Sequence, residues 1–149
     1  MEANKKTIED LKQGFLAIKS KKDIVDVLNN ANEIIYDKKV KKITLKSLTY
    51  YANPKLSKKR YTTFQIKKKS GAKRTINAPV KELKFILRAM NFILHHIATP
   101  HQAATGFIKG KSVIDNAREH EAQNYVLNVD LKDFFHAFER KHVKYGFMK

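Results

Sequence analysis

The sequence predicts an α+β fold, and three observations lead to this class. Apolar residues recur at helical spacing near the N-terminus and, in a wider stripe, over residues 80–97. Two runs that suit short strands flank Ser70 and Gly71, a dipeptide typical of hairpin turns. A further strand-like run, residues 126–129, leads directly to Asp130. The chain therefore combines helices with a small amount of β-structure.

The N-terminal part is predicted to be helical. Ile8, Leu11 and Phe15 recur at the spacing of one helix face. The pattern predicts helices over residues 5–19 and 23–30, a helical turn over 32–36, and a helix over 44–51 that Thr44 caps. Pro54 ends the last helix, because the residue before a proline disfavours the helical conformation. We expect residues 1–58 to form a helical extension, separate from residues 59–149.

A β-hairpin is predicted next, with strands over residues 62–68 and 73–77. Five cations surround its expected tip: Lys67, Lys68, Lys69, Lys73 and Arg74. Cations held on a rigid scaffold suit a triphosphate or a template strand. For Lys69 and Lys73, a solvated loop tip is an equal alternative.

A helix over residues 80–97 follows, and its wide apolar stripe indicates core packing. Pro100 ends it. Ser112 and Asp115 have the spacing of a capping box with a shorter acid, so a helix is expected over residues 113–120.

The charge balance points to a polyanionic partner. The 149 residues include 31 Lys or Arg and only 14 Asp or Glu, which gives a net charge of +17. Residues 38–81 contain 15 Lys or Arg and no acid. Such a surface suits a phosphate backbone. The alternative is a solvated, lysine-rich face.

Several classes of site are excluded or disfavoured by composition. The chain has no cysteine, which rules out a disulfide framework and a thiolate zinc site. Its six histidines lack ligand spacing. No apolar run has transmembrane length and no signal-peptide core precedes the first helix, so a cytoplasmic location without membrane contact is expected.

Asp130 is the leading catalytic candidate, because it ends an apolar run and is followed closely by Asp133. A carboxylate at the end of a buried strand is well placed to hold Mg²⁺, which prefers oxygen ligands. A turn or helix-cap role for Asp130 is the alternative.

Four segments, taken in order, resemble the bacterial reverse transcriptases of the retron and group II intron type. They are YTTFQIKKKSGAKRTINAP (61–79), LKFILRAMNFIL (83–94), GFIKGKSVIDNAREH (106–120) and VLNVDLKDFF (126–135). The resemblance covers roughly residues 61–149. It implies that residues 59–149 comprise the polymerase fingers, with a β-hairpin and packing helices, and the first strand of an incomplete palm.

The resemblance also implies roles for individual residues. Lys68 and Arg74 would contact the triphosphate of the incoming deoxynucleotide, and Ile76 would lie near the templating base. Lys109, Lys111, Ser112 and Asn116 would lie beside the channel for the template or primer, and the partners would be an RNA template and an RNA–DNA hybrid. Capping explains Ser112 equally well, and Asn116 fits a surface helix position.

In the same comparison Asp130 is a metal ligand and Leu131 offers its backbone carbonyl to a second ion, Mg²⁺ or Mn²⁺. Asp133 and Phe134 would place backbone amides near the triphosphate, and Phe135 would exclude a ribose 2′-hydroxyl. Core packing is the alternative for the two phenylalanines, and we expect it for one of them.

The chain departs from the family in one important respect. It has no Asp-Asp pair, and Glu139 is its only acid after Asp133. One carboxylate cannot hold two metal ions in working geometry. We therefore expect the N-terminal part of an RNA-directed DNA polymerase that is inactive alone. The alternatives are a non-catalytic, basic RNA-binding module and a remnant of a mobile or phage-defence element.

Overall fold

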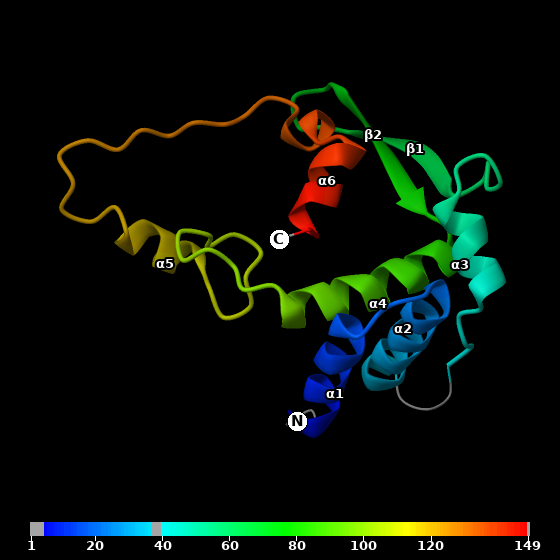
Figure 1. Ribbon diagram of the computed structural model, residues 1–149. Coiled ribbons are helices and arrows are strands. Elements are labelled where there is room, and N and C mark those ends of the chain that lie inside the picture. The colour runs from blue at the N-terminus through cyan, green and yellow to red at the C-terminus, as the bar shows by residue number, and fades with distance from the viewer. Residues whose placement is uncertain (1–4, 37–39, 149) are drawn as a thin grey trace. The chain divides into compact units, whose positions relative to one another are not determined.

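The computed structural model describes residues 5–36 and 40–148, and the chain divides into two compact units. The first unit spans Met1–Thr99 and the second spans Pro100–Lys149. The predicted α+β class is confirmed: helices accompany a two-stranded antiparallel hairpin (Figure 1). No helix among the described residues is both long and apolar enough to cross a membrane.

The first unit begins with the helices α1 (Lys5–Leu16), α2 (Lys21–Tyr36) and α3 (Leu45–Ala52). The predicted break between residues 30 and 32 is wrong, because α2 runs through it without interruption. Ala31 is the best of helix formers, and its complete burial adds tertiary support to that turn. The predicted Thr44 cap is confirmed, since its hydroxyl accepts a hydrogen bond of 3.1 Å from the backbone N–H of Ser47.

The predicted hairpin forms from β1 (Tyr61–Lys67) and β2 (Lys73–Pro79). Its turn is closed by hydrogen bonds from Lys68 N–H to the Ala72 carbonyl, at 2.7 Å, and from Gly71 N–H to the Lys68 carbonyl, at 3.0 Å. Gly71 has a φ of 84°, a conformation that residues with a Cβ rarely adopt.

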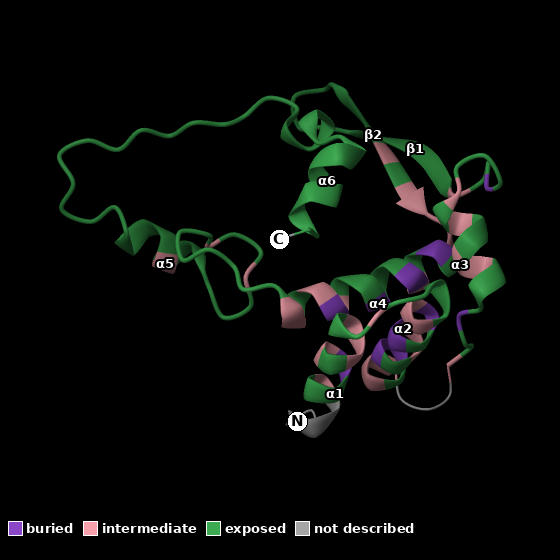
Figure 2. Ribbon diagram, in the orientation of Figure 1, coloured by how far each residue is buried: buried purple, intermediate pink, exposed green. Residues whose placement is uncertain are grey.

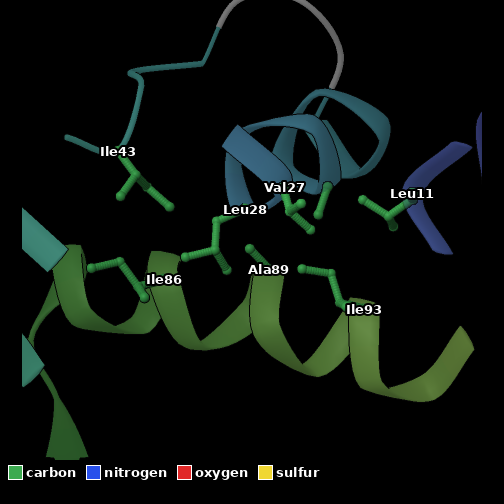
Figure 3. Packing of buried hydrophobic residues seen from close by; sticks show 8 residues of the cluster. Leu11, Val27, Leu28, Ile43, Ile86, Ala89 and Ile93 are labelled. Atoms are coloured by element: carbon green, nitrogen blue, oxygen red, sulfur yellow. The ribbon is translucent and has the colours of Figure 1, made fainter. Parts of the chain in front are cut away.

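Helix α4 (Lys81–Ile97) completes the core of the first unit, as its apolar stripe predicted. Ile86, Ala89 and Ile93 of α4 face α1, α2 and the segment before α3 (Figure 3). The residues that they meet are Leu11, Val27, Leu28, Ala31 and Ile43. Ala31 and Ala89 are both 0% exposed. Two alanines at this point allow α2 and α4 to approach closely, with little volume left for larger side chains.

The second unit contains the short helices α5 (Val113–Arg118) and α6 (Arg140–Gly146) and a 3₁₀ turn, η1 (Phe134–Ala137). Its described residues are almost all exposed (Figure 2). The predicted strand before Asp130 does not form, because residues 125–130 have no strand partner. A strand must share its backbone hydrogen bonds with a neighbour, and the hairpin strands pair only with each other.

Candidate nucleotide and nucleic-acid interface

Two predicted site residues, Arg74 and Ile76, lie on the same face of the hairpin. The register pairs Arg74 with Ile66 and Ile76 with Phe64, and residues paired across antiparallel strands share a face. Phe64 and Ile66 are 47% and 46% exposed. This set, Phe64, Ile66, Arg74 and Ile76, forms an apolar face with one cation, which we call the Arg74 face.

The other cations of the hairpin occupy different positions. Lys67 pairs with Lys73 on the opposite face, whereas Lys68 and Lys69 belong to the turn. The five cations around the tip therefore do not share one face, because the alternation of side chains along a strand separates Arg74 from Lys67 and Lys73. All five cations are exposed, and none of them forms an ion pair with a residue that the structure describes.

Ser112 forms the predicted capping box at the start of α5. The Ser112 N–H and hydroxyl each donate to Asp115 Oδ2 at 2.6 Å. The hydrogen bond from the Ser112 side chain is the largest cause that holds the pKa of Asp115 below its usual range. Asn116, Lys109 and Lys111 are exposed, so their side chains are free to meet a ligand.

The predicted palm residues are close neighbours in the sequence, and they share one open surface hollow. Asp130, Leu131, Asp133, Phe134 and Phe135 line one hollow of about 510 Å³, with His136 beside them. The hollow arises because the chain turns sharply at Asp133, whose φ of 53° is left-handed. The backbone carbonyl of Asp133 then accepts hydrogen bonds from the N–H groups of His136, at 2.8 Å, and Ala137, at 3.2 Å, and so starts η1. Asp and Asn tolerate this conformation better than most residues.

The two phenylalanines of the motif differ in their surroundings. Phe134 makes edge-to-face contacts with Phe135 and Phe138, with ring centroids 5.4 and 4.9 Å apart. It is 44% exposed, whereas Phe135 is 86% exposed. Neither ring is buried, so the core packing expected for one of them is not observed, although Phe134 is the more covered of the two and Phe135 presents its ring to solvent.

The described residues supply only some of the ligands that a metal site would need. Within residues 5–36 and 40–148, no group of three or more His, Cys, Asp or Glu side chains is placed to hold an ion. The exposed carboxylate of Asp130 and the nearby carbonyl of Leu131 are oxygen donors of the kind that Mg²⁺ prefers. These donors fit a site that the substrate's phosphates and further carboxylates complete.

Sequence reasoning did not single out Phe64 and Ile66, which share the Arg74 face with two predicted site residues. The signal was present, because both side chains alternate with polar residues along β1 and therefore share a face. The sequence did not reveal that Phe64 and Ile66 stay exposed and that Arg74 lies directly across from Ile66.

Comparison with known proteins finds several retron reverse transcriptases. The chain is 39% identical over 87 residues to the retron Mx162 reverse transcriptase of Myxococcus xanthus, a match that covers 56% of this chain and 17% of that protein. It is 32% identical over 114 residues to the retron Ec86 reverse transcriptase of Escherichia coli, which covers 73% of this chain and 33% of that protein. The retron Ec83 reverse transcriptase of Escherichia coli is 36% identical over 75 residues, half of this chain and 24% of that protein.

The predicted resemblance to retron-type reverse transcriptases is thereby confirmed. The chain spans about a sixth to a third of the length of these relatives. No protein-family model matches the chain, and no solved structure matches it significantly.

Proposed function

Starting from the similarity to retron reverse transcriptases, we propose that this chain supplies the fingers and the first palm motif of an RNA-directed DNA polymerase. The observation that supports this most is the 32–39% identity to retron reverse transcriptases, and the hollow lined by Asp130, Leu131 and Phe135 agrees with it. The proposed substrates are deoxynucleoside triphosphates paired to an RNA template. The proposed reaction takes place in the cytoplasm.

In the proposed site the side chains divide the tasks of binding and orientation. Asp130 and the Leu131 carbonyl would hold Mg²⁺ or Mn²⁺, which neutralises charge on the phosphates during nucleotidyl transfer. Arg74 binds the triphosphate through its planar, forked guanidinium, and Lys68 adds a mobile charge at the turn. Ile76, beside Phe64, packs against the templating base.

The residues of the second unit have further roles in the proposed reaction. The backbone amides of Asp133 and Phe134 bind the triphosphate, and the exposed ring of Phe135 blocks the position of a 2′-hydroxyl. Lys109, Lys111, Ser112 and Asn116 line the path of the template or of the RNA–DNA hybrid. Each of these contacts is a prediction for the assembled polymerase.

A chimera tests the proposal directly. Residues 61–135 replace the equivalent segment of the retron Ec86 reverse transcriptase, and DNA synthesis on an RNA template is measured. We expect the chimera to extend a primer and Asp130→Asn to reduce synthesis to background, because the amide cannot replace the charged metal ligand.

Asp133→Asn is the matched control. It removes the same charge three residues later, asparagine tolerates the left-handed conformation, and the proposed role of Asp133 uses only its backbone. Comparable activity in the two variants, or an inactive parent chimera, would contradict the proposal.

The rival function, a non-catalytic RNA-binding module, is favoured by one observation: the five hairpin cations are exposed and lack described ion-pair partners. Under that function the isolated chain binds RNA with a steep salt dependence, and the chimera is inactive. The same experiment therefore distinguishes the two functions.

A further inference from the structure

A second pocket lies in the first unit, apart from the hairpin residues discussed above. It is bounded by the end of α2, residues 40–43, α3 and the first part of α4, and its volume is about 560 Å³. This volume falls within the range of about 300–1,000 Å³ that is typical of ligand pockets. None of the site residues predicted from the sequence lines it.

The apolar part of this pocket is built from aromatic rings. Tyr36 and Phe85 stack, with centroids 5.4 Å apart and planes inclined by 24°. Arg88 Nη1 donates a hydrogen bond of 3.0 Å to Tyr36 Oη and so joins α4 to the end of α2. Tyr51 contributes a third ring from α3. Flat aromatic surfaces of this kind are the usual platform for an unpaired base.

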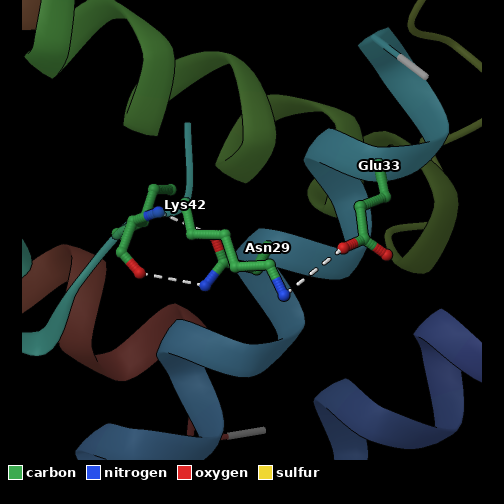
Figure 4. Close-up of polar contacts among 4 residues, drawn as sticks. Asn29, Glu33 and Lys42 are labelled. Carbon is green, nitrogen blue, oxygen red and sulfur yellow. Dashed lines mark hydrogen bonds and ion pairs between the residues drawn. The ribbon is translucent and has the colours of Figure 1, made fainter. Parts of the chain in front are cut away.

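The wall opposite α4 is also fixed in place. The side chain of Asn29 donates from Nδ2 to the Ile43 carbonyl at 3.0 Å, and its Oδ1 accepts from the Ile43 N–H at 2.7 Å (Figure 4). This pair of bonds holds the segment before α3 against α2, with Ile43 buried. This part of the pocket wall is therefore held in place before a ligand arrives, which lowers the cost of ordering it on binding.

The rim of the pocket is strongly basic. Lys41, Lys42, Lys81, Lys84 and Arg88 line it, whereas Glu82 is the only acid among its described lining residues. Lys42 Nζ lies 4.0 Å from Glu33 Oε1. Because this ion pair is exposed, it contributes little to stability. Cations around stacked aromatic rings are the combination found in single-strand binders, where charge follows the phosphates and rings receive the bases.

We propose that this pocket binds an unpaired nucleotide of single-stranded RNA, with its base against Tyr36 and Phe85 and its phosphates at Lys84 and Arg88. The choice of RNA rests on the proposed function, in which the RNA strand enters unpaired and the DNA strand is made already paired. The site is additional to the hairpin and to Asp130.

The first test compares two double variants of the whole chain that lose equal charge. Binding of a fluorescein-labelled 12-residue oligouridylate is followed by anisotropy over a range of salt. Lys84→Gln with Arg88→Gln is expected to weaken binding about tenfold and to lower the salt slope by about 1.4, since each phosphate contact contributes about 0.7. Lys21→Gln with Lys22→Gln, at the far end of α2 and about 21 Å along that helix from Tyr36, is expected to change affinity less than twofold.

The second test isolates the aromatic contact. Tyr36→Leu keeps apolar bulk but removes the ring, so we expect about tenfold weaker binding of the oligouridylate. Tyr36→Phe keeps the ring and loses only the hydroxyl bonded to Arg88, and its affinity is expected to stay within twofold. Equal effects of the two double-charge variants, or of the two Tyr36 variants, would overturn the proposal.

Photo-crosslinking separates this proposal from the proposed function. RNA that carries 4-thiouridine is expected to crosslink to the peptides containing Tyr36 or Phe85, and to do so equally in a Lys68→Gln, Arg74→Gln variant. If the chimera fails while these crosslinks persist, only the polymerase assignment falls. If crosslinks form only elsewhere and none forms at the Tyr36 or Phe85 peptides, the pocket assignment falls.

Two other ligands are tested in the same assay. If an oligodeoxyuridylate binds as tightly and shows the same loss in the Lys84, Arg88 variant, the strand is not specifically RNA and the proposal is overturned. If polyglutamate binds with that affinity and that loss, the pocket belongs to an acidic protein, which also overturns it.

Discussion

At the scale of single residues, Asp23 shows how a carboxylate fixes local structure. Its Oδ2 accepts hydrogen bonds from the N–H groups of Lys19, at 2.9 Å, and Ser20, at 2.8 Å, while Ser20 Oγ accepts from Asp23 N–H at 3.3 Å. These bonds form a reciprocal cap at the start of α2. The backbone hydrogen bond from Lys19 is the largest cause that lowers the pKa of Asp23, followed by the bonds from Ser20.

The lowered pKa predicts a pH dependence of stability. The unfolded chain, with Asp near its ordinary pKa of about 3.9, binds a proton at higher pH than the folded chain does. The contribution of Asp23 is therefore complete above that value and is lost as the pH falls through the lower folded pKa. In urea unfolding followed by circular dichroism, Asp23→Asn is expected to reduce stability at pH 7 and to flatten its fall below pH 4.

Asp26→Asn is the matched control for this prediction. It removes the same charge from an exposed position of the same helix, with no described hydrogen bond to lose. A pH profile that Asp26→Asn flattens as much as Asp23→Asn does would show that net charge, and not the cap, is responsible.

At the scale of elements, the sequence predicted those that depend on local chemistry. The Thr44 and Ser112 caps, the Gly71 turn and the apolar stripe of α4 each require only nearby residues, and all four are present. The continuity of α2 was missed because the burial of Ala31 depends on α4, which lies far away in the sequence. The strand before Asp130 was wrongly predicted for the same reason: propensity alone cannot provide a partner.

Sequence reasoning also missed the pair of hydrogen bonds between the Asn29 side chain and the Ile43 backbone, which we call the Asn29 clamp. Asn29 to Ile43 is a contact between a helix side chain and a distant backbone, and no short motif marks it. Asn29→Ala would leave both backbone groups of the buried Ile43 without this partner. We expect a loss of about 1–3 kcal/mol in the free energy of unfolding.

Urea unfolding at neutral pH measures this loss, with Asn30→Ala as the control. Asn30 is the next residue of α2, is exposed and has no described side-chain hydrogen bond, so a change within about 0.5 kcal/mol is expected. Similar losses in both variants would mean that the clamp does not stabilise the first unit.

At the scale of the whole molecule, the two units differ in what stabilises them. Every buried apolar residue that the structure describes belongs to the first unit. In the second unit α5 has only six residues, and isolated helices shorter than about 12 residues are marginal in water. Large apolar side chains there, including Tyr125 at 95% and Leu127 at 88%, are exposed. The candidate palm residues therefore lie in the part of the chain with the least tertiary support.

Hydrogen exchange in the chain alone is expected to follow this division. Amides of α2 and α4 should exchange slowly, because they open only when the core opens, whereas amides of residues 125–135 should exchange at nearly unprotected rates. In the reverse transcriptase chimera, residues 126–130 should become protected, since a polymerase palm would give this run the strand partner it lacks. Slow exchange of these residues in the chain alone would contradict the first expectation. Fast exchange in an active chimera would mean that Asp130 acts from a segment without strand pairing, and the proposed palm strand would have to be abandoned.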